Sequence, residues 1–242
     1  MAVNEWKQCP DIRPGLGGGR IFLNQRLDFV EYFHATTTAS FEEVLRNIEA
    51  GEPPYVDEGD PEYVDEPPFL EEWQRADAAM TITGAACLDL LQSTFHAYLD
   101  EYMDQIGNKH VIPQLKTLGQ KGWFGNYRAF FGKYLEIDWG VSGADLNLLE
   151  QVILARNDFT HNTDLLSLNS FQTAFHSEKY PDSAFADSRW KKMSFRRDRT
   201  PLVVPSETLK RSIQELRKLC DYLDNERYEL PKRWRAKKNA EG

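Results

Sequence analysis

Two residue types that can act on a phosphate ester stand close together in the sequence. Four residues, Asn-Asp-Phe-Thr, separate Arg156 from His161. A guanidinium can bind a phosphate group through two hydrogen bonds, and a histidine, whose usual pKa is about 6.5, can transfer a proton near neutral pH. The pair therefore predicts a site that binds phosphate and moves a proton.

The residues before Arg156 predict the element that carries this pair. Apolar residues recur at helical spacing up to Arg156, at Leu146, Leu149, Val152 and Ile153. An arginine at the end of such a stripe is costly to bury unless it meets an anion or another partner. Five residues turn through roughly 500° of helix, so the two side chains diverge by about 140° unless the helix bends or frays. We therefore expect the motif at a helix end.

The run from Leu149 to Asn162, LEQVILARNDFTHN, resembles the signature of the HEPN superfamily. That signature is an apolar helix, then Arg, a polar residue that is often Asn, and a His four to six residues later. The approach to the motif at 134–138, the Leu-Val-Val segment at 202–204 and the helix from Ser206 also resemble the surroundings in bacterial members. The resemblance covers about residues 70–228.

The resemblance implies a helical bundle that pairs as a homodimer and joins two motifs into a metal-independent, RNA-cleaving site. Arg156 would then bind phosphate, His161 would act as acid or base, and Asn157 would orient one of them or the substrate. Asp158 either orients His161 or repels the scissile phosphate. Asn162 completes the His-Asn ending that is common in the family, so Asp158 and Asn162 are candidate modulators.

Three functions remain open from the sequence. The first is an endoribonuclease of the toxin or phage-defence kind, with RNA as substrate and an antitoxin or regulatory protein as a further partner. The second is a non-catalytic dimer that binds RNA, nucleotide or a protein through the same face, with Arg156 and His161 merely capping their helix. The third is a scaffold that uses its charged segments to dock into a larger assembly.

A second cluster, residues 189–199, alternates cations with aromatic side chains. Such a segment is typical of a groove that follows phosphates and stacks unpaired bases, although a charged surface loop has the same composition. Residues 189–242 hold 16 basic and 8 acidic residues, which leaves a net charge of -17 for residues 1–188 because the whole chain has -9. The predicted RNA-binding residues are Arg189, Trp190, Lys191, Lys192, Phe195, Arg196, Arg197 and Arg199.

Hydrophobic stripes elsewhere predict an all-α fold, an up-and-down bundle of four to five main helices. We expect an appendage at 1–50 with short helices at about 27–34 and 41–50, and an acidic, Pro-rich linker at 51–68. The bundle would follow at 69–230, with its last helix ended by Pro231, and a basic tail would close the chain at 231–242.

The cysteine content and the hydrophobicity of the chain predict its cellular location and whether it binds a metal or cofactor. The cysteines Cys9, Cys87 and Cys220 are far apart and odd in number, so they predict neither a disulfide framework nor a zinc site. We expect no metal and no cofactor. No stretch has the length and hydrophobicity of a membrane span or a signal peptide, which favours a cytoplasmic protein without membrane contact. His34, His96, His110 and His176 have no partner at catalytic spacing and are expected to be structural or surface residues.

Overall fold

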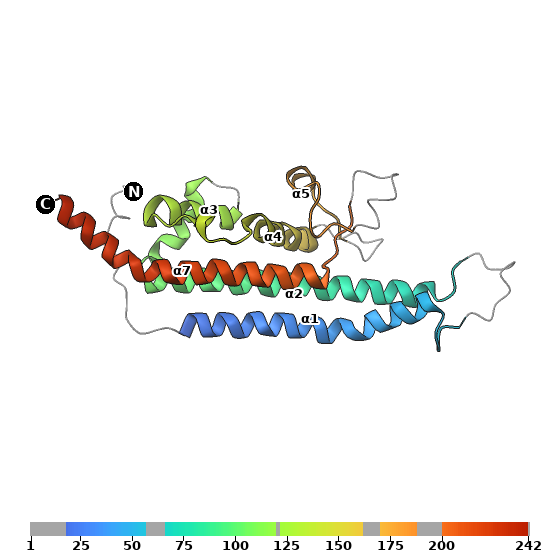
Figure 1. The fold of residues 1–242 in the computed structure, drawn as a ribbon. Coiled ribbons are helices and arrows are strands. Elements are labelled where there is room, and N and C mark those ends of the chain that lie inside the picture. Colours follow the sequence, from blue (N-terminus) through green and yellow to red (C-terminus); the bar gives the residue numbers. More distant parts are fainter. Residues whose placement is uncertain (1–17, 57–65, 120–121, 162–169, 188–199, 242) are drawn as a thin grey trace. The chain divides into compact units, whose positions relative to one another are not determined.

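The fold consists of helices, as the sequence predicts. The computed structural model describes residues 18–56, 66–119, 122–161, 170–187 and 200–241. Within these residues, extended pairing is limited to two isolated bridges, Phe171 with Pro201 and Ala186 with Leu202. The α-helices in Figure 1 are α1 (Gly18–Ala50), α2 (Leu70–Gln105), α3 (Gly122–Phe130), α4 (Leu146–His161), α5 (Ala174–Lys179) and α7 (Ser206–Glu241).

Shorter helical turns connect some of these elements. A 3-10 segment, η2 (Lys109–Leu118), precedes α3, and a π-helical turn, η3 (Phe131–Leu135), follows it. Another 3-10 turn, η4 (Trp139–Val141), is capped by Asp138, whose Oδ1 accepts from the Gly140 amide at 2.8 Å. No described helix combines the length and hydrophobicity that crossing a membrane requires.

The described residues form two compact units. The first unit consists of the described residues within 18–27, 93–150 and 211–241, and the second of those within 28–92 and 151–210. Helices α1, α2, α4 and α7 each contribute residues to both units. We describe each unit by itself.

The core of the first unit contains a cluster of aromatic rings. Trp139 is buried against Phe95, Phe124 and Phe131, with ring centroids 5.4 to 6.1 Å apart. Tilted and edge-to-face contacts at these distances are the favourable geometries for aromatic pairs. The helical spacing of aromatics in residues 124–135 therefore marks buried core, as the sequence indicates.

The core of the second unit is aliphatic and closely packed. Cys87 is fully buried, and burial raises the pKa of its thiol to about 11, so it is a structural residue as expected. Gly84 lets the chain at Val204 approach α2 closely, because a Cβ at Gly84 would lie 2.5 Å from the Val204 Cβ. The segment around Val204 is thereby fixed against the helix that also carries Asp89.

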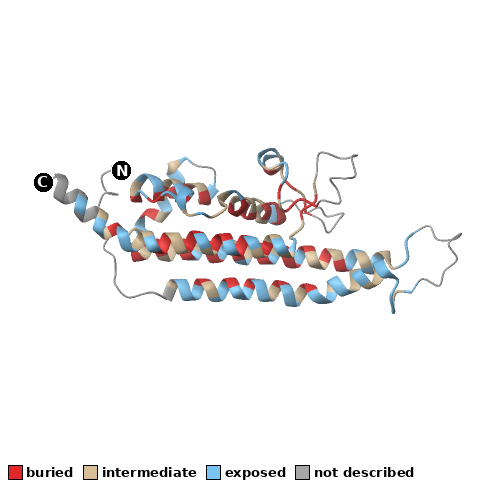
Figure 2. Ribbon diagram, in the orientation of Figure 1, coloured by how far each residue is buried: buried red, intermediate tan, exposed pale blue. Residues whose placement is uncertain are grey.

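The N-terminal region differs from the prediction of two short helices, because residues 18–50 form one continuous helix. Its buried residues, Leu23, Leu27, Val30, His34 and Thr38, recur every three or four positions. Figure 2 shows buried positions recurring along α1. The two predicted helices left out residues 35–40, which include three consecutive threonines. In the structure, the buried Thr38 donates its hydroxyl to Glu42 at 3.2 Å, and burial outweighs a small propensity penalty.

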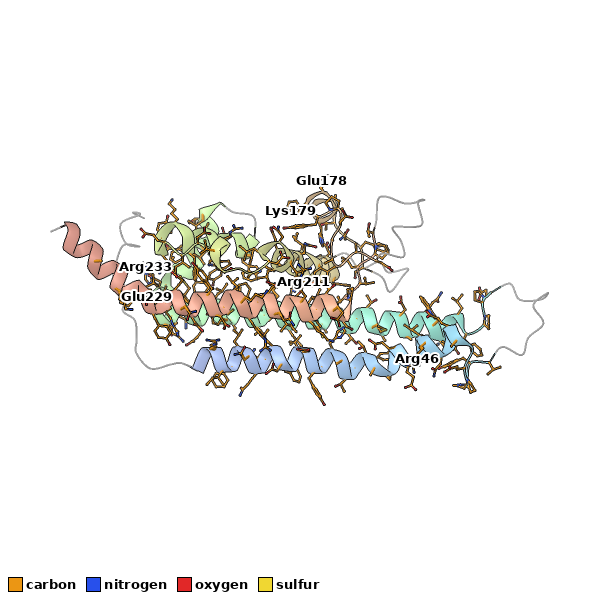
Figure 3. The ribbon with its side chains drawn as sticks, viewed as in Figure 1. Arg46, Glu178, Lys179, Arg211, Glu229 and Arg233 are labelled. Atoms are coloured by element: carbon orange, nitrogen blue, oxygen red, sulfur yellow. The ribbon has the colours of Figure 1, made fainter. Side chains whose placement is uncertain are left out.

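The expectation that Pro231 ends the last helix is also wrong, because α7 continues to Glu241. A proline inside a helix loses one hydrogen bond and crowds the preceding turn. Contacts on either side of Pro231 offset this cost: Leu230 is buried, and Arg233 reaches back to the Glu226 carboxylate and to the carbonyl of Glu136. The region predicted as a basic tail therefore begins as helix. Figure 3 labels Arg233 and, one turn before it, Glu229.

Candidate functional site

The predicted motif lies on the last turns of α4, in the second unit. The apolar side of these turns, Val152, Ala155 and Phe159, is buried, as the stripe in the sequence predicts. The helix continues without a break through His161, its last residue. Arg156 therefore sits within the helix, and only His161 stands at its end.

Arg156 is neutralised by a carboxylate from another helix. Its Nε and Nη2 approach Oδ1 of Asp89 on α2 at 2.7 and 2.6 Å. Its Nη1 also donates a long hydrogen bond, 3.4 Å, to the side-chain oxygen of Asn157. The Arg156 side chain is 27% exposed and that of Asp89 is 50% exposed. The ion pair is thus open to solvent on one side, and Asn157 orients the guanidinium.

His161 is exposed at the C-terminal end of α4. Because the helix is regular from Arg156 to His161, the five-residue separation turns their side chains about 140° apart. One chain therefore does not direct both groups at a single phosphate.

Asp158 contacts a histidine other than His161. Its Oδ2 lies 2.7 Å from Nδ1 of His176 on α5 and accepts from the amide of Thr173 at 3.1 Å. Asp158 is 3% exposed and His176 is fully buried. Of the two roles left open for Asp158, orienting a histidine is seen here with His176 and not with His161. His176 is buried within the fold, in line with the expectation that it is a structural or surface residue.

This buried contact continues into a hydrogen-bonded chain. The other ring nitrogen of His176, Nε2, lies 3.1 Å from the hydroxyl of Ser183, which also accepts from the amide of Phe185. The order Ser, His, Asp is that of a nucleophilic triad, but the Ser183 side chain is buried and its oxygen is occupied by the backbone. The chain is a structural connection between α4 and α5. Glu178 and Lys179, on the exposed side of α5 in Figure 3, take no part in it.

Local sequence patterns predict only part of this hydrogen-bond network. Thr173 caps α5 by accepting from the His176 amide, which is a common pattern at a helix start. The contact between Asp158 and His176 spans 18 residues, and no short-range spacing predicts it. Likewise, Asp89 lies 67 residues from Arg156 and was not among the predicted site residues.

The remaining predicted site residues lie outside the described residues. These are Asn162 and the whole RNA-binding cluster at 189–199, together with most of the acidic linker, residues 57–65. Among the described residues, no three His, Cys, Asp or Glu side chains gather closely enough to hold a metal ion.

Comparison with known proteins does not assign a function to this chain. No family model, no characterised protein and no solved structure matches this chain. What the site does must therefore be argued from its own chemistry.

Proposed function

We propose that this protein is a metal-independent endoribonuclease that acts as a two-fold homodimer through Arg156 and His161. The observation that carries the proposal is the placement of a partly exposed arginine and an exposed histidine on the final turns of one regular helix. By resemblance to HEPN proteins, its role would be that of a toxin or phage-defence enzyme.

The ion pair with Asp89 is compatible with phosphate binding by Arg156. Ion pairs between solvent-exposed side chains contribute only about 0 to 1 kcal/mol, because water and salt screen them. A phosphate can accept two charge-assisted hydrogen bonds from the same guanidinium, and such bonds are about twice as strong as neutral ones. RNA can therefore displace Asp89 at little cost.

The reaction follows from the groups that two copies supply. One His161 accepts the proton of a ribose 2′-hydroxyl, whose oxygen attacks the adjacent phosphorus. The bond from phosphorus to the 5′-oxygen breaks, and the second His161 donates a proton to that leaving oxygen. The two Arg156 guanidinium groups stabilise the extra negative charge on the phosphorane. The products are a 2′,3′-cyclic phosphate and a free 5′-hydroxyl.

A second candidate is a non-catalytic dimer that binds RNA, nucleotide or a protein partner through this face. The specific observation in its favour is that Arg156 already has a carboxylate partner while His161 points away from it. In that case the motif holds α4 and α2 together and presents His161 as a contact residue.

RNA turnover separates the two candidates. We expect the purified protein to cleave RNA in the presence of EDTA and to leave 2′,3′-cyclic phosphate ends. His161→Ala should lower the rate by about 10² to 10⁴, as loss of a general acid or base typically does, and Arg156→Ala by about 10² to 10³. Thr160→Ala is a matched control, because Thr160 is exposed on the same turn and bonds only to its own helix, at the Arg156 carbonyl.

The controls must show that each variant is folded. Circular dichroism and light scattering should be unchanged in His161→Ala, since this side chain is exposed at the helix end. Cleavage by His161→Ala at the wild-type rate would exclude the proposed mechanism. Tight RNA binding without any cleavage by the wild type would instead support the binding module.

Asp89→Asn tests how the ion pair affects RNA binding. Because the neutral amide no longer competes for Arg156, we expect RNA affinity to increase by up to about fivefold, equivalent to roughly 1 kcal/mol. Electrophoretic mobility shift or fluorescence anisotropy with a non-cleavable RNA measures this. Weaker binding would mean that Asp89 mainly positions the guanidinium and does not compete with phosphate.

A further inference from the structure

The first unit contains a small polar pocket, distinct from the motif. Its volume is about 90 Å³, and residues of α1, α2 and α7 line it. Four of the polar residues in its wall are buried, namely Tyr98, Tyr102, Gln105 and Asp224. The charged and hydroxyl-bearing residues are Arg20, Tyr98, Glu101, Tyr102, Asp224, Arg227 and Tyr228.

One hydroxyl in this wall has no partner. Tyr102 is 1% exposed, and its OH forms no hydrogen bond with any residue that the structure describes. A buried polar group left unpaired typically costs about 1 to 3 kcal/mol. Burial also raises the pKa of Tyr102 well above that of a free tyrosine, so the hydroxyl stays protonated and acts as a donor. An acceptor inside the pocket would satisfy it.

A carboxylate in the wall of the pocket can accept a hydrogen bond from a ligand. Asp224 is buried, and burial raises the pKa of its side chain above the usual value of 3.8. Tyr98 donates to its Oδ1 at 3.0 Å, and Arg227 approaches the same oxygen at 3.6 Å. Both contacts use Oδ1, so Oδ2 can accept from a cation inside the pocket.

The charges of the pocket balance. Among the lining residues, Arg20 and Arg227 contribute two positive charges, and Glu101 and Asp224 contribute two negative charges. Arg20 is also paired, at 2.7 Å, with Asp221 outside the lining. A simple anion would meet both carboxylates, and a simple cation would meet both guanidinium groups. A molecule that carries one charge of each sign avoids both penalties, since each of its ends can face its own counterpart.

An adjoining crevice extends the pocket with a more apolar wall. It has a volume of about 290 Å³ and shares Gly19, Tyr98 and Glu101 with the polar pocket. Its apolar side chains include Phe22, Leu23 and Ala97. Phe22 is 65% exposed, so a ligand that covered its ring would gain by removing apolar surface from water.

We propose that the pocket and crevice bind a small amphipathic zwitterion of the α-amino acid class with an apolar side chain. The ligand carboxylate would accept from the hydroxyl of Tyr102 and from Arg227. Its ammonium group would donate to Asp224 and Glu101, and its side chain would lie along Phe22 and Leu23. The site lies wholly within the first unit and does not depend on the proposed RNA cleavage.

Four probes test each part of this assignment by isothermal titration calorimetry on the whole chain. L-phenylalanine carries both charges and an apolar side chain, 3-phenylpropionate lacks the ammonium group, 2-phenylethylamine lacks the carboxylate, and glycine lacks the side chain. We expect L-phenylalanine to bind at least about tenfold more tightly than each of the others, a difference of roughly 1.4 kcal/mol. The proposal is overturned if L-phenylalanine does not bind at millimolar concentration, or if a truncated probe binds equally well.

Variants then assign the binding to this pocket. Tyr102→Phe removes only the unpaired hydroxyl, and we expect it to weaken L-phenylalanine binding about tenfold. Tyr127→Phe is the matched control, because its hydroxyl pairs with Asp100 and lies outside the pocket lining. Thermal unfolding verifies that both variants fold. Unchanged affinity in Tyr102→Phe would remove the pocket as the binding site.

Discussion

Two buried polar clusters, one in each unit, differ in how completely they are satisfied. In the second unit, Asp158, His176 and Ser183 form a closed chain in which both ring nitrogens of His176 have partners. In the first unit, Tyr98 is bonded to Cys220 and Asp224, whereas the hydroxyl of Tyr102, one turn later on α2, has no partner among the described residues. A buried network in which every polar group has a partner stabilises the fold. A buried polar group without a partner, such as the Tyr102 hydroxyl, is where we propose that a ligand binds.

The largest effect should come from breaking the completed cluster. Leaving a buried polar group without its hydrogen-bond partner typically costs about 1 to 3 kcal/mol, and more for a charged group, so we expect Asp158→Ala and His176→Ala each to destabilise the protein by about 3 kcal/mol or more. At about 2 to 4 °C per kcal/mol, Tm should fall by on the order of 10 °C. Urea and thermal unfolding measure both quantities.

His161→Ala provides the control for that experiment, because this histidine is exposed at the end of the same helix as Asp158. It should leave stability unchanged. The double variant Asp158→Ala/His176→Ala should cost less than the sum of the single variants, since residues in direct contact are not additive. A loss below about 1 kcal/mol in the single variants would contradict the assignment of this cluster to the fold.

We expect smaller changes in the free energy of unfolding, of opposite sign, when two neighbouring tyrosines of the first unit are replaced by phenylalanine. Tyr98→Phe removes donors to the Cys220 carbonyl and to Asp224, so we expect a loss of about 1 to 3 kcal/mol. Tyr102→Phe removes an unpaired buried hydroxyl, so we expect the ligand-free protein to gain up to about 1 kcal/mol. Urea unfolding at one pH compares the two. Equal destabilisation by both variants would show that Tyr102 is paired in solution.

The smallest expected effect concerns His34, a buried histidine of the second unit. Burial lowers its pKa below the usual 6.5, although the nearby Glu42 and the backbone at Val204 act in the opposite direction. Because the folded state resists protonation more than the unfolded state, the contribution of His34 is present above pH 6.5. It is lost as the pH falls through the lowered folded-state value.

The contribution of His34 is isolated by measuring the free energy of unfolding against pH for the wild type and for His34→Gln. Their difference should change only below about pH 6.5, with a slope of at most roughly 1.4 kcal/mol per pH unit for one proton. The carboxylates that titrate at lower pH are common to both proteins and cancel. A pH-independent difference would show that His34 does not titrate in this range.

Much of the local structure could be predicted because hydrophobic periodicity reports which side of a helix is buried. Apolar or small residues recur at helical spacing over residues 73–106, the segment that became α2, and the stripe before Arg156 became the buried side of α4. Two helix ends were predicted wrongly. The Thr-rich stretch of α1 and Pro231 in α7 are weak or unfavourable helix formers, yet burial of Thr38 and the contact of Arg233 with the Glu136 carbonyl favour helix at both places. Such tertiary packing is not visible in a local pattern.

By itself, the sequence determined that the chain is helical and that Arg156 and His161 lie five residues apart at the end of an apolar stripe. That spacing fixes their angular separation once the segment is a regular helix. Only the tertiary structure decided that Arg156 meets Asp89, that Asp158 meets His176, and that Tyr102 faces a pocket. The reason is that the partner of a side chain depends on which faces of two helices pack together. The residues of these pairs are 18 and 67 positions apart, and no sequence pattern predicts contacts over such separations.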